Sequence, residues 1–134
     1  MKDLAMNFRL IMVTAALALA TVSAPAPVMA HTKVVASTPA QGAKVASVRK
    51  VTITFSEALL VPTVGVSIVM TAMPGMPNHG EMQIRNFTQS WSDSNRKLTL
   101  NLKKPLVAGT YEVRWQAAGA DGHRMKGKVN FIVK

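Results

Sequence analysis

The sequence has no cysteine and few aromatic or acidic residues, and each shortage excludes a class of protein. Without cysteine the chain forms no disulfide and cannot supply the thiolate of a blue-copper electron-transfer centre. Aromatic residues make up only 5% of the chain, which offers little material for the planar row that a carbohydrate-binding surface needs. No stretch shows helical periodicity, so a helical bundle is not expected.

Acidic residues are also scarce, since 6 of them stand against 16 lysines and arginines, for a formal net charge of +10. An excess of basic residues of this size is typical of proteins that bind nucleic acid. The basic residues are, however, scattered singly or in pairs along alternating stretches rather than gathered in one block. A solvated positive surface is therefore favoured and no nucleic-acid partner is predicted, while attraction to anionic membranes or an acidic partner stays open.

One long apolar run occurs, over residues 10–22, and it is too short to span a bilayer comfortably. It follows a positively charged start and precedes a small-residue Val-Met-Ala pattern that ends at Ala30. These features are typical of a secretory signal peptide. We therefore predict a signal peptide over residues 1–30, cleavage after Ala30, and an exported, periplasmic domain of residues 31–134 that begins with His31.

The exported region consists of short alternating segments separated by turn residues. Apolar and polar residues alternate with a period of two, which indicates strands with one face on a core. The pattern predicts one all-β domain of about seven strands, a Greek-key sandwich or small barrel. The expected strands are residues 51–55, 66–70, 98–102, 111–115 and 129–133, with weaker signals at 33–37 and 82–88.

A row of soft metal donors recurs at every third position within the chain. Its members are Met70, Met73, Met76, His79 and Met82. Methionine rows usually pack a core, but Pro74, Gly75, Pro77 and Gly80 make a regular helix here very unfavourable. Thioethers and imidazole suit Cu(I) and not hard cations. The row therefore predicts a loop that binds Cu(I), although packing of irregular gaps by methionine remains the alternative.

A second group of donors is spread along the chain. Cleavage after Ala30 would leave His31 with a free α-amine and an imidazole, which together can chelate one metal ion. Asp121 and His123 flank a glycine before the last strand, and Glu57 follows an early strand. Nitrogen and oxygen ligands of this kind suit Cu(II). Each residue alone could be incidental, a surface turn pair or a solvated charge, so their joint occurrence carries the prediction.

The exported region resembles the CopC-type periplasmic copper-resistance proteins over nearly all its length. The resemblance rests on the motifs His-Thr-Lys at 31–33, Ser-Thr-Pro-Ala at 37–40, Phe-Ser-Glu at 55–57, the methionine segment at 69–76, Gly-Thr-Tyr-Glu-Val-Arg-Trp at 109–115 and Asp-Gly-His at 121–123. It implies a cupredoxin-like Greek-key β-barrel with copper sites at opposite ends. The implied Cu(II) ligands are His31, Glu57, Asp121 and His123. The implied Cu(I) ligands are Met70, Met73, Met76, His79 and Met82.

These observations predict a periplasmic copper-binding protein that is not an enzyme. We expect it to be a monomer that sequesters Cu(I) and Cu(II) or transfers copper between its two sites. Copper ions are its expected ligands, and a membrane or outer-membrane copper transport protein is the partner that the resemblance implies. Two alternatives stay open: a copper mono-oxygenase built on a histidine brace, and an immunoglobulin-like interaction module with incidental histidines.

Overall fold

The computed structural model describes residues 24–25, 31–76 and 78–134. The predicted signal peptide, residues 1–30, lies outside the described residues except for residues 24 and 25. Within the part that is described, no helix is long and apolar enough to cross a membrane. The described residues from His31 onward contain all the residue ranges predicted as strands from the sequence.

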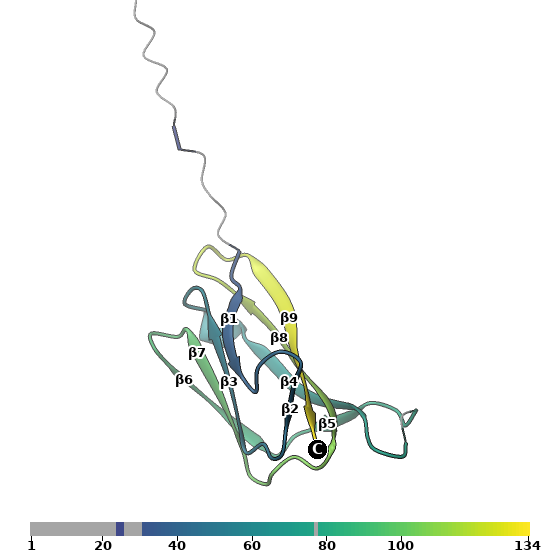
Figure 1. Cartoon of the computed structure of the whole chain (residues 1–134). Coiled ribbons are helices and arrows are strands. Elements are labelled where there is room, and N and C mark those ends of the chain that lie inside the picture. The colour runs from purple at the N-terminus through teal and green to yellow at the C-terminus, as the bar shows by residue number, and fades with distance from the viewer. Residues whose placement is uncertain (1–23, 26–30, 77) are drawn as a thin grey trace, which may run out of the picture.

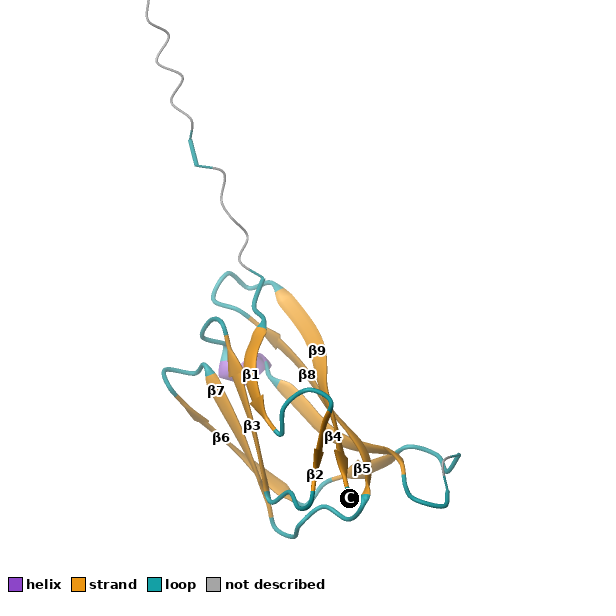
Figure 2. Ribbon diagram, in the orientation of Figure 1, coloured by secondary structure: helices purple, strands orange, loops and turns teal. Residues whose placement is uncertain are grey.

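Two sheets pack face to face and form a β-sandwich (Figures 1 and 2). One sheet has four strands in the order β1-β3-β7-β6, and the other has five in the order β2-β9-β8-β4-β5. All pairs are antiparallel except β2 with β9, which is parallel. The strands are β1 (Val34–Thr38), β2 (Ala43–Val45), β3 (Lys50–Phe55), β4 (Gly65–Ala72), β5 (Met82–Ile84), β6 (Phe87–Ser92), β7 (Lys97–Leu102), β8 (Gly109–Ala118) and β9 (Arg124–Val133).

The alternating residues of the long strands form the core, as the period-two pattern predicts. In β3 the apolar positions are buried and the threonines between them are partly exposed, and β7 and β8 repeat this pattern. Tyr111 and Phe131 stack inside the sandwich, and Trp115 meets Phe55 edge to face across the two sheets. Because the described chain has no cysteine, this apolar interior is what holds the sheets together.

The predicted all-β class is confirmed, but the described residues form nine strands instead of about seven. The short strand β2 was not predicted, since three residues carry too little alternation to recognise. The predicted strand at 82–88 is divided, with β5 ending at Ile84 and β6 beginning at Phe87. Trp91 in β6 is partly buried and stacks on Phe55.

Strand β8 spans the whole length of the sandwich and joins its two ends. Its first residues pair with the end of β4, where the chain leaves for a loop of residues 73–81 that protrudes from the domain (Figure 1). Its last residue, Ala118, pairs with Arg124 at the other end, close to where residue 31 enters the domain. Ten residues of strand cover about 30 Å, so features at the two ends do not share one metal ion.

Candidate metal centres

At one end of the sandwich, exposed His31 directly precedes a buried threonine, Thr32. Thr32 is 6% exposed and is the single buried polar residue among those the structure describes. Its hydroxyl lies 3.5 Å from Oε2 of Glu57, and its backbone N–H donates to the thioether sulfur of Met125 at 3.1 Å. These contacts hold His31 near Glu57, while the His31 residue itself is exposed. We call this region, with Asp121 and His123, the histidine end.

Asp121 and His123 form a pair on the turn between β8 and β9. The Nδ1 atom of His123 lies 2.9 Å from Oδ2 of Asp121, and the His123 backbone N–H donates to Oδ1 at 3.0 Å. Gly122 between them has a φ of +81°, a left-handed conformation that favours glycine. The hydrogen bonds from His123 lower the pKa of Asp121. Since a carboxylate only accepts, Nδ1 carries the proton and Nε2 is left as the metal-binding nitrogen.

Gly119 marks the point where these segments meet. A Cβ atom at this glycine would lie 3.4 Å from Oδ1 of Asp121, 3.5 Å from the Thr32 hydroxyl and 3.7 Å from the Met125 methyl carbon. The fold therefore brings Asp121, the residue after His31 and a residue close to His123 together around one glycine. Even so, the described residues contain no preformed group of three or more histidine, cysteine or acidic side chains arranged around a metal position.

The second end carries the protruding loop of residues 73–81, which we call the methionine loop. Its described residues, 73–76 and 78–81, are irregular, as Pro74, Gly75 and Gly80 predict, and a backbone bridge between Met73 and Met76 closes its first turn. Met76 and Met82 are 55% and 51% exposed, whereas Met73 packs partly against the core. Met70 is only 2% exposed and belongs to the core itself. The five predicted donors are thus divided between the interior and the surface.

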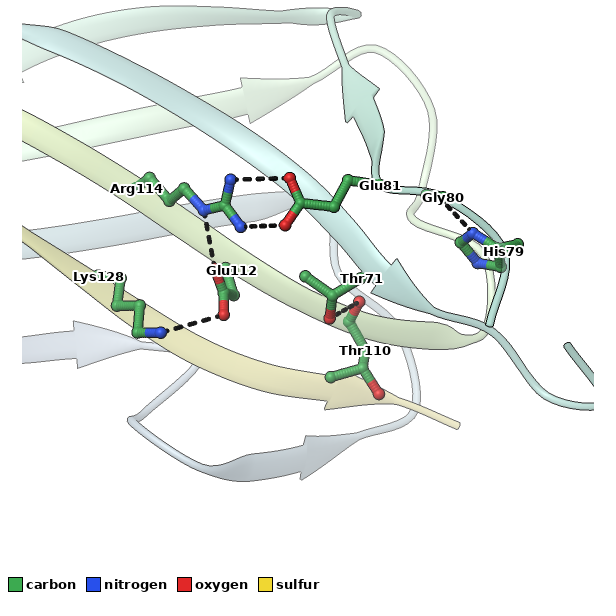
Figure 3. Close-up of polar contacts among 8 residues, drawn as sticks. All are labelled: Thr71, His79, Gly80, Glu81, Thr110, Glu112, Arg114 and Lys128. Carbon is green, nitrogen blue, oxygen red and sulfur yellow. Dashed lines mark hydrogen bonds and ion pairs between the residues drawn. The ribbon is translucent and has the colours of Figure 1, made fainter. Parts of the chain in front are cut away.

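His79 sits in the methionine loop with one ring nitrogen engaged. Its Nδ1 atom contacts the backbone carbonyl oxygen of Gly80 (Figure 3). The backbone N–H of His79 donates to the carbonyl of Met76 at 3.5 Å. Because a carbonyl only accepts, Nδ1 carries the proton and the lone pair lies on Nε2. That Nε2 atom is buried without a hydrogen-bond partner in the described structure. An unpartnered imidazole nitrogen on a loop that carries thioethers is suited to a soft metal ion.

An ion-pair network ties the return of the methionine loop to the outer face of β8 (Figure 3). The two terminal nitrogens of Arg114 contact the two oxygens of Glu81 at 2.6 and 3.0 Å. The Nε atom of Arg114 contacts Glu112 at 2.8 Å, and Lys128 contacts the other oxygen of Glu112 at 3.2 Å. Hydrogen bonds from Arg114 lower the pKa of both Glu81 and Glu112.

Sequence reasoning did not single out Thr32, Met125 or Arg114, although all three touch the candidate sites. Thr32 and Met125 are 93 positions apart, so nothing local connects them. Arg114 and Glu81 are separated by 33 positions, and only the pairing of β4 with β8 brings them together. Met125 follows His123 by two positions, and this proximity in the sequence is the one signal that was available.

The fold is a small two-sheet β-sandwich that carries histidine and carboxylate side chains at one end and a thioether-rich loop at the other. The CopC domain matches residues 34–134, which is most of the chain. The chain belongs to the CopC family.

Named relatives and solved structures agree with this assignment. The chain is 41% identical over 105 residues to copper resistance protein C of Pseudomonas syringae pv. tomato, covering 78% of this chain and 82% of that protein. It is 35% identical over 106 residues to copper resistance protein C of Escherichia coli, covering 79% and 83%. The crystal structure of PcoC, a methionine-rich copper resistance protein from Escherichia coli, superposes with a TM-score of 0.69 at 31% identity, covering 78% of this chain and all of PcoC.

Proposed function

We propose that this protein binds copper in the periplasm and serves copper resistance or homeostasis, without catalysing a reaction. The observation that carries the proposal is that two chemically different sets of side chains lie at the two ends of strand β8. One set offers nitrogen and oxygen, and the other offers thioethers with one imidazole. Copper is the common biological metal for which both sets are suitable, in its two oxidation states. The family membership supports the same metal.

The histidine end is the proposed Cu(II) site, with His31, Glu57, Asp121 and His123 as ligands. A mature chain starting at His31 would chelate through its α-amine and imidazole. His123 would add Nε2, because Asp121 holds the Nδ1 proton and orients the ring. Glu57 is within reach through its contact with Thr32. Since these residues are not prearranged around one point, copper binding would draw the exposed side chains together.

The methionine loop is the proposed Cu(I) site. Met73, Met76 and Met82 are the accessible thioethers, and His79 would contribute its unpartnered Nε2. Met70, also predicted as a ligand, points into the core, so its sulfur reaches a loop metal only if this end of β4 moves. We therefore assign Met70 the lesser part in the proposed site.

Two sites of different softness would let the oxidation state of copper decide where the ion is held. The protein would then sequester copper, or pass it to a membrane or outer-membrane copper transport protein. About 30 Å of sandwich separates the ends, so movement of copper between them would require release or a second molecule.

The test is titration of mature protein beginning at His31 with Cu(II) in air and with Cu(I) without oxygen. We expect at least one ion of each kind to bind more tightly than about 1 μM, which corresponds to about 8 kcal/mol. A variant with one extra alanine before His31 keeps every side chain but separates the α-amine from the His31 imidazole, and should weaken Cu(II) while Cu(I) on the methionine loop binds unchanged. Binding of neither ion below this concentration would exclude the proposal and favour an interaction module.

The same loaded protein separates a copper carrier from a mono-oxygenase. With Cu(II) bound and ascorbate added, a carrier should consume oxygen no faster than the extended variant containing the same amount of copper. Faster consumption that depends on the free amine of His31 would favour the histidine-brace enzyme.

A further inference from the structure

Met125 lies at the start of β9 and places a thioether inside the histidine end. Its sulfur accepts the backbone N–H of Thr32 at 3.1 Å, and that nitrogen belongs to the peptide bond directly after His31. Its methyl carbon lies beside Gly119, the glycine that Oδ1 of Asp121 also approaches. A soft donor therefore stands among the nitrogen and oxygen donors at the end of the sandwich opposite to the methionine loop.

Packing alone is the simpler role for a methionine, and Met125 is indeed partly buried against the core. Two features point further. The sulfur accepts the Thr32 N–H, and an aliphatic side chain would leave that group without this acceptor. The Met125 methyl group and Oδ1 of Asp121 also approach the same glycine, Gly119, so the thioether lies at the same end of the sandwich as a proposed ligand.

The chemistry of sulfur makes this position significant for copper. A thioether has two lone pairs, and the Thr32 N–H occupies one, so the second is free for a metal ion. Thioether and imidazole ligands stabilise Cu(I), whereas carboxylates do little for it. His123 Nε2 and the His31 donors, at the same end of the sandwich, would complete a set of nitrogen and sulfur ligands if copper drew these side chains together.

We propose that Met125 is a copper ligand of the histidine end and enables this end to bind Cu(I) as well as Cu(II). The inference rests on the proposed function, because it assumes that the histidine end binds copper. It adds a ligand that the methionine row does not include. The histidine end would then keep its copper when the surroundings become reducing, independently of the methionine loop.

The experiment needs a background in which the methionine loop cannot bind Cu(I). We choose the mature variant M73L/M76L/M82L/H79A, which removes the accessible loop donors, and titrate it anaerobically with Cu(I) in competition with bicinchoninate. We expect one Cu(I) to bind, and adding M125L should weaken it at least about tenfold. Leucine has nearly the volume of methionine, so packing changes little.

Two measurements keep the result decisive. I84L in the same background changes a partly buried apolar side chain of β5 and removes no sulfur, and should leave Cu(I) affinity within twofold. X-ray absorption of the Cu(I)-loaded background should show one sulfur neighbour, and this measurement stands even if M125L fails to fold. No Cu(I) binding by the background, an unchanged affinity in M125L, or a copper shell without sulfur would each overturn the inference.

Cu(II) titration of the background distinguishes failure of this inference from failure of the proposed function. Cu(II) should bind there as in the parent protein, because none of its proposed ligands is altered. If Cu(II) binds but Cu(I) does not, Met125 is only a packing residue. If neither ion binds, the histidine end is not a copper site and the inference is also lost.

Discussion

The two ends of the sandwich are built in different ways. At the histidine end, residues near positions 31, 57, 121 and 125 meet around Gly119, and a buried threonine connects them. At the other end, three of the five candidate donors lie on one protruding loop and Met82 follows them in β5. The loop is held by the three-residue strand β5 and by Arg114. The histidine end therefore depends on tertiary contacts, whereas the methionine loop depends on local sequence and on few anchors.

The two ends should therefore respond differently to substitutions. Substitutions that disturb the sheets should affect the histidine end, because its donors come from separate segments. The methionine loop should keep its copper affinity in such variants, unless the contact between Glu81 and Arg114 of β8 is lost. Three sets of variants and one change of pH test this difference between the two ends.

The largest effect should come from Met70, the row member that belongs to the core. M70A removes buried thioether and methylene groups next to Gly109, and should lower the free energy of unfolding by about 3 kcal/mol. M76A removes an exposed side chain and should change it by less than about 0.5 kcal/mol. Urea unfolding of the metal-free proteins measures both. Equal losses would mean that the row is not divided between core and surface.

Substitution of His123 and of His79 should weaken the binding of different oxidation states of copper. H123A should weaken Cu(II) about 100-fold, or about 2.7 kcal/mol, and leave Cu(I) on the loop unchanged. H79A should weaken Cu(I) about tenfold and leave Cu(II) unchanged. Each variant is the matched control of the other in competition titrations. If both weakened the same ion, the idea of two independent ends would be wrong.

Release of the ion pair at the loop should have a smaller effect. R114A removes both contacts to Glu81 and should weaken Cu(I) about threefold, since an exposed ion pair contributes little to stability. Cu(II) affinity should stay constant. K128A breaks only the contact with Glu112 and serves as the control. A Cu(I) affinity unchanged in R114A would show that β5 alone positions the loop.

The smallest effect concerns pH. Hydrogen bonds from Arg114 and Lys128 lower the pKa of Glu112, so this carboxylate favours the folded state above its unfolded pKa of about 4.3. The contribution is lost as the pH falls through the lower folded value. Between pH 6 and pH 3, E112Q should therefore lose about 2 °C less in Tm than the parent protein. A parallel loss in both proteins would contradict this assignment.

Much of the fold could be predicted because strand alternation is a local signal. The inward positions of β3, β7, β8 and β9 follow directly from residues two apart. Strand β2 could not be found, because three residues show no usable period and its parallel partner β9 is remote in the chain. The stacking of Trp91 on Phe55 is likewise a contact between strands that are not adjacent in sequence.

The sequence by itself determined the all-β class, the absence of a thiolate centre and the thioether-rich loop, because composition and short periodicities express these directly. Tertiary structure alone decided that Met70 faces the core and that Met125 reaches Thr32. It also decided that Arg114 anchors the loop through Glu81. The physical reason is that a side chain's partners across two sheets depend on register and packing, and neither is encoded in a local spacing.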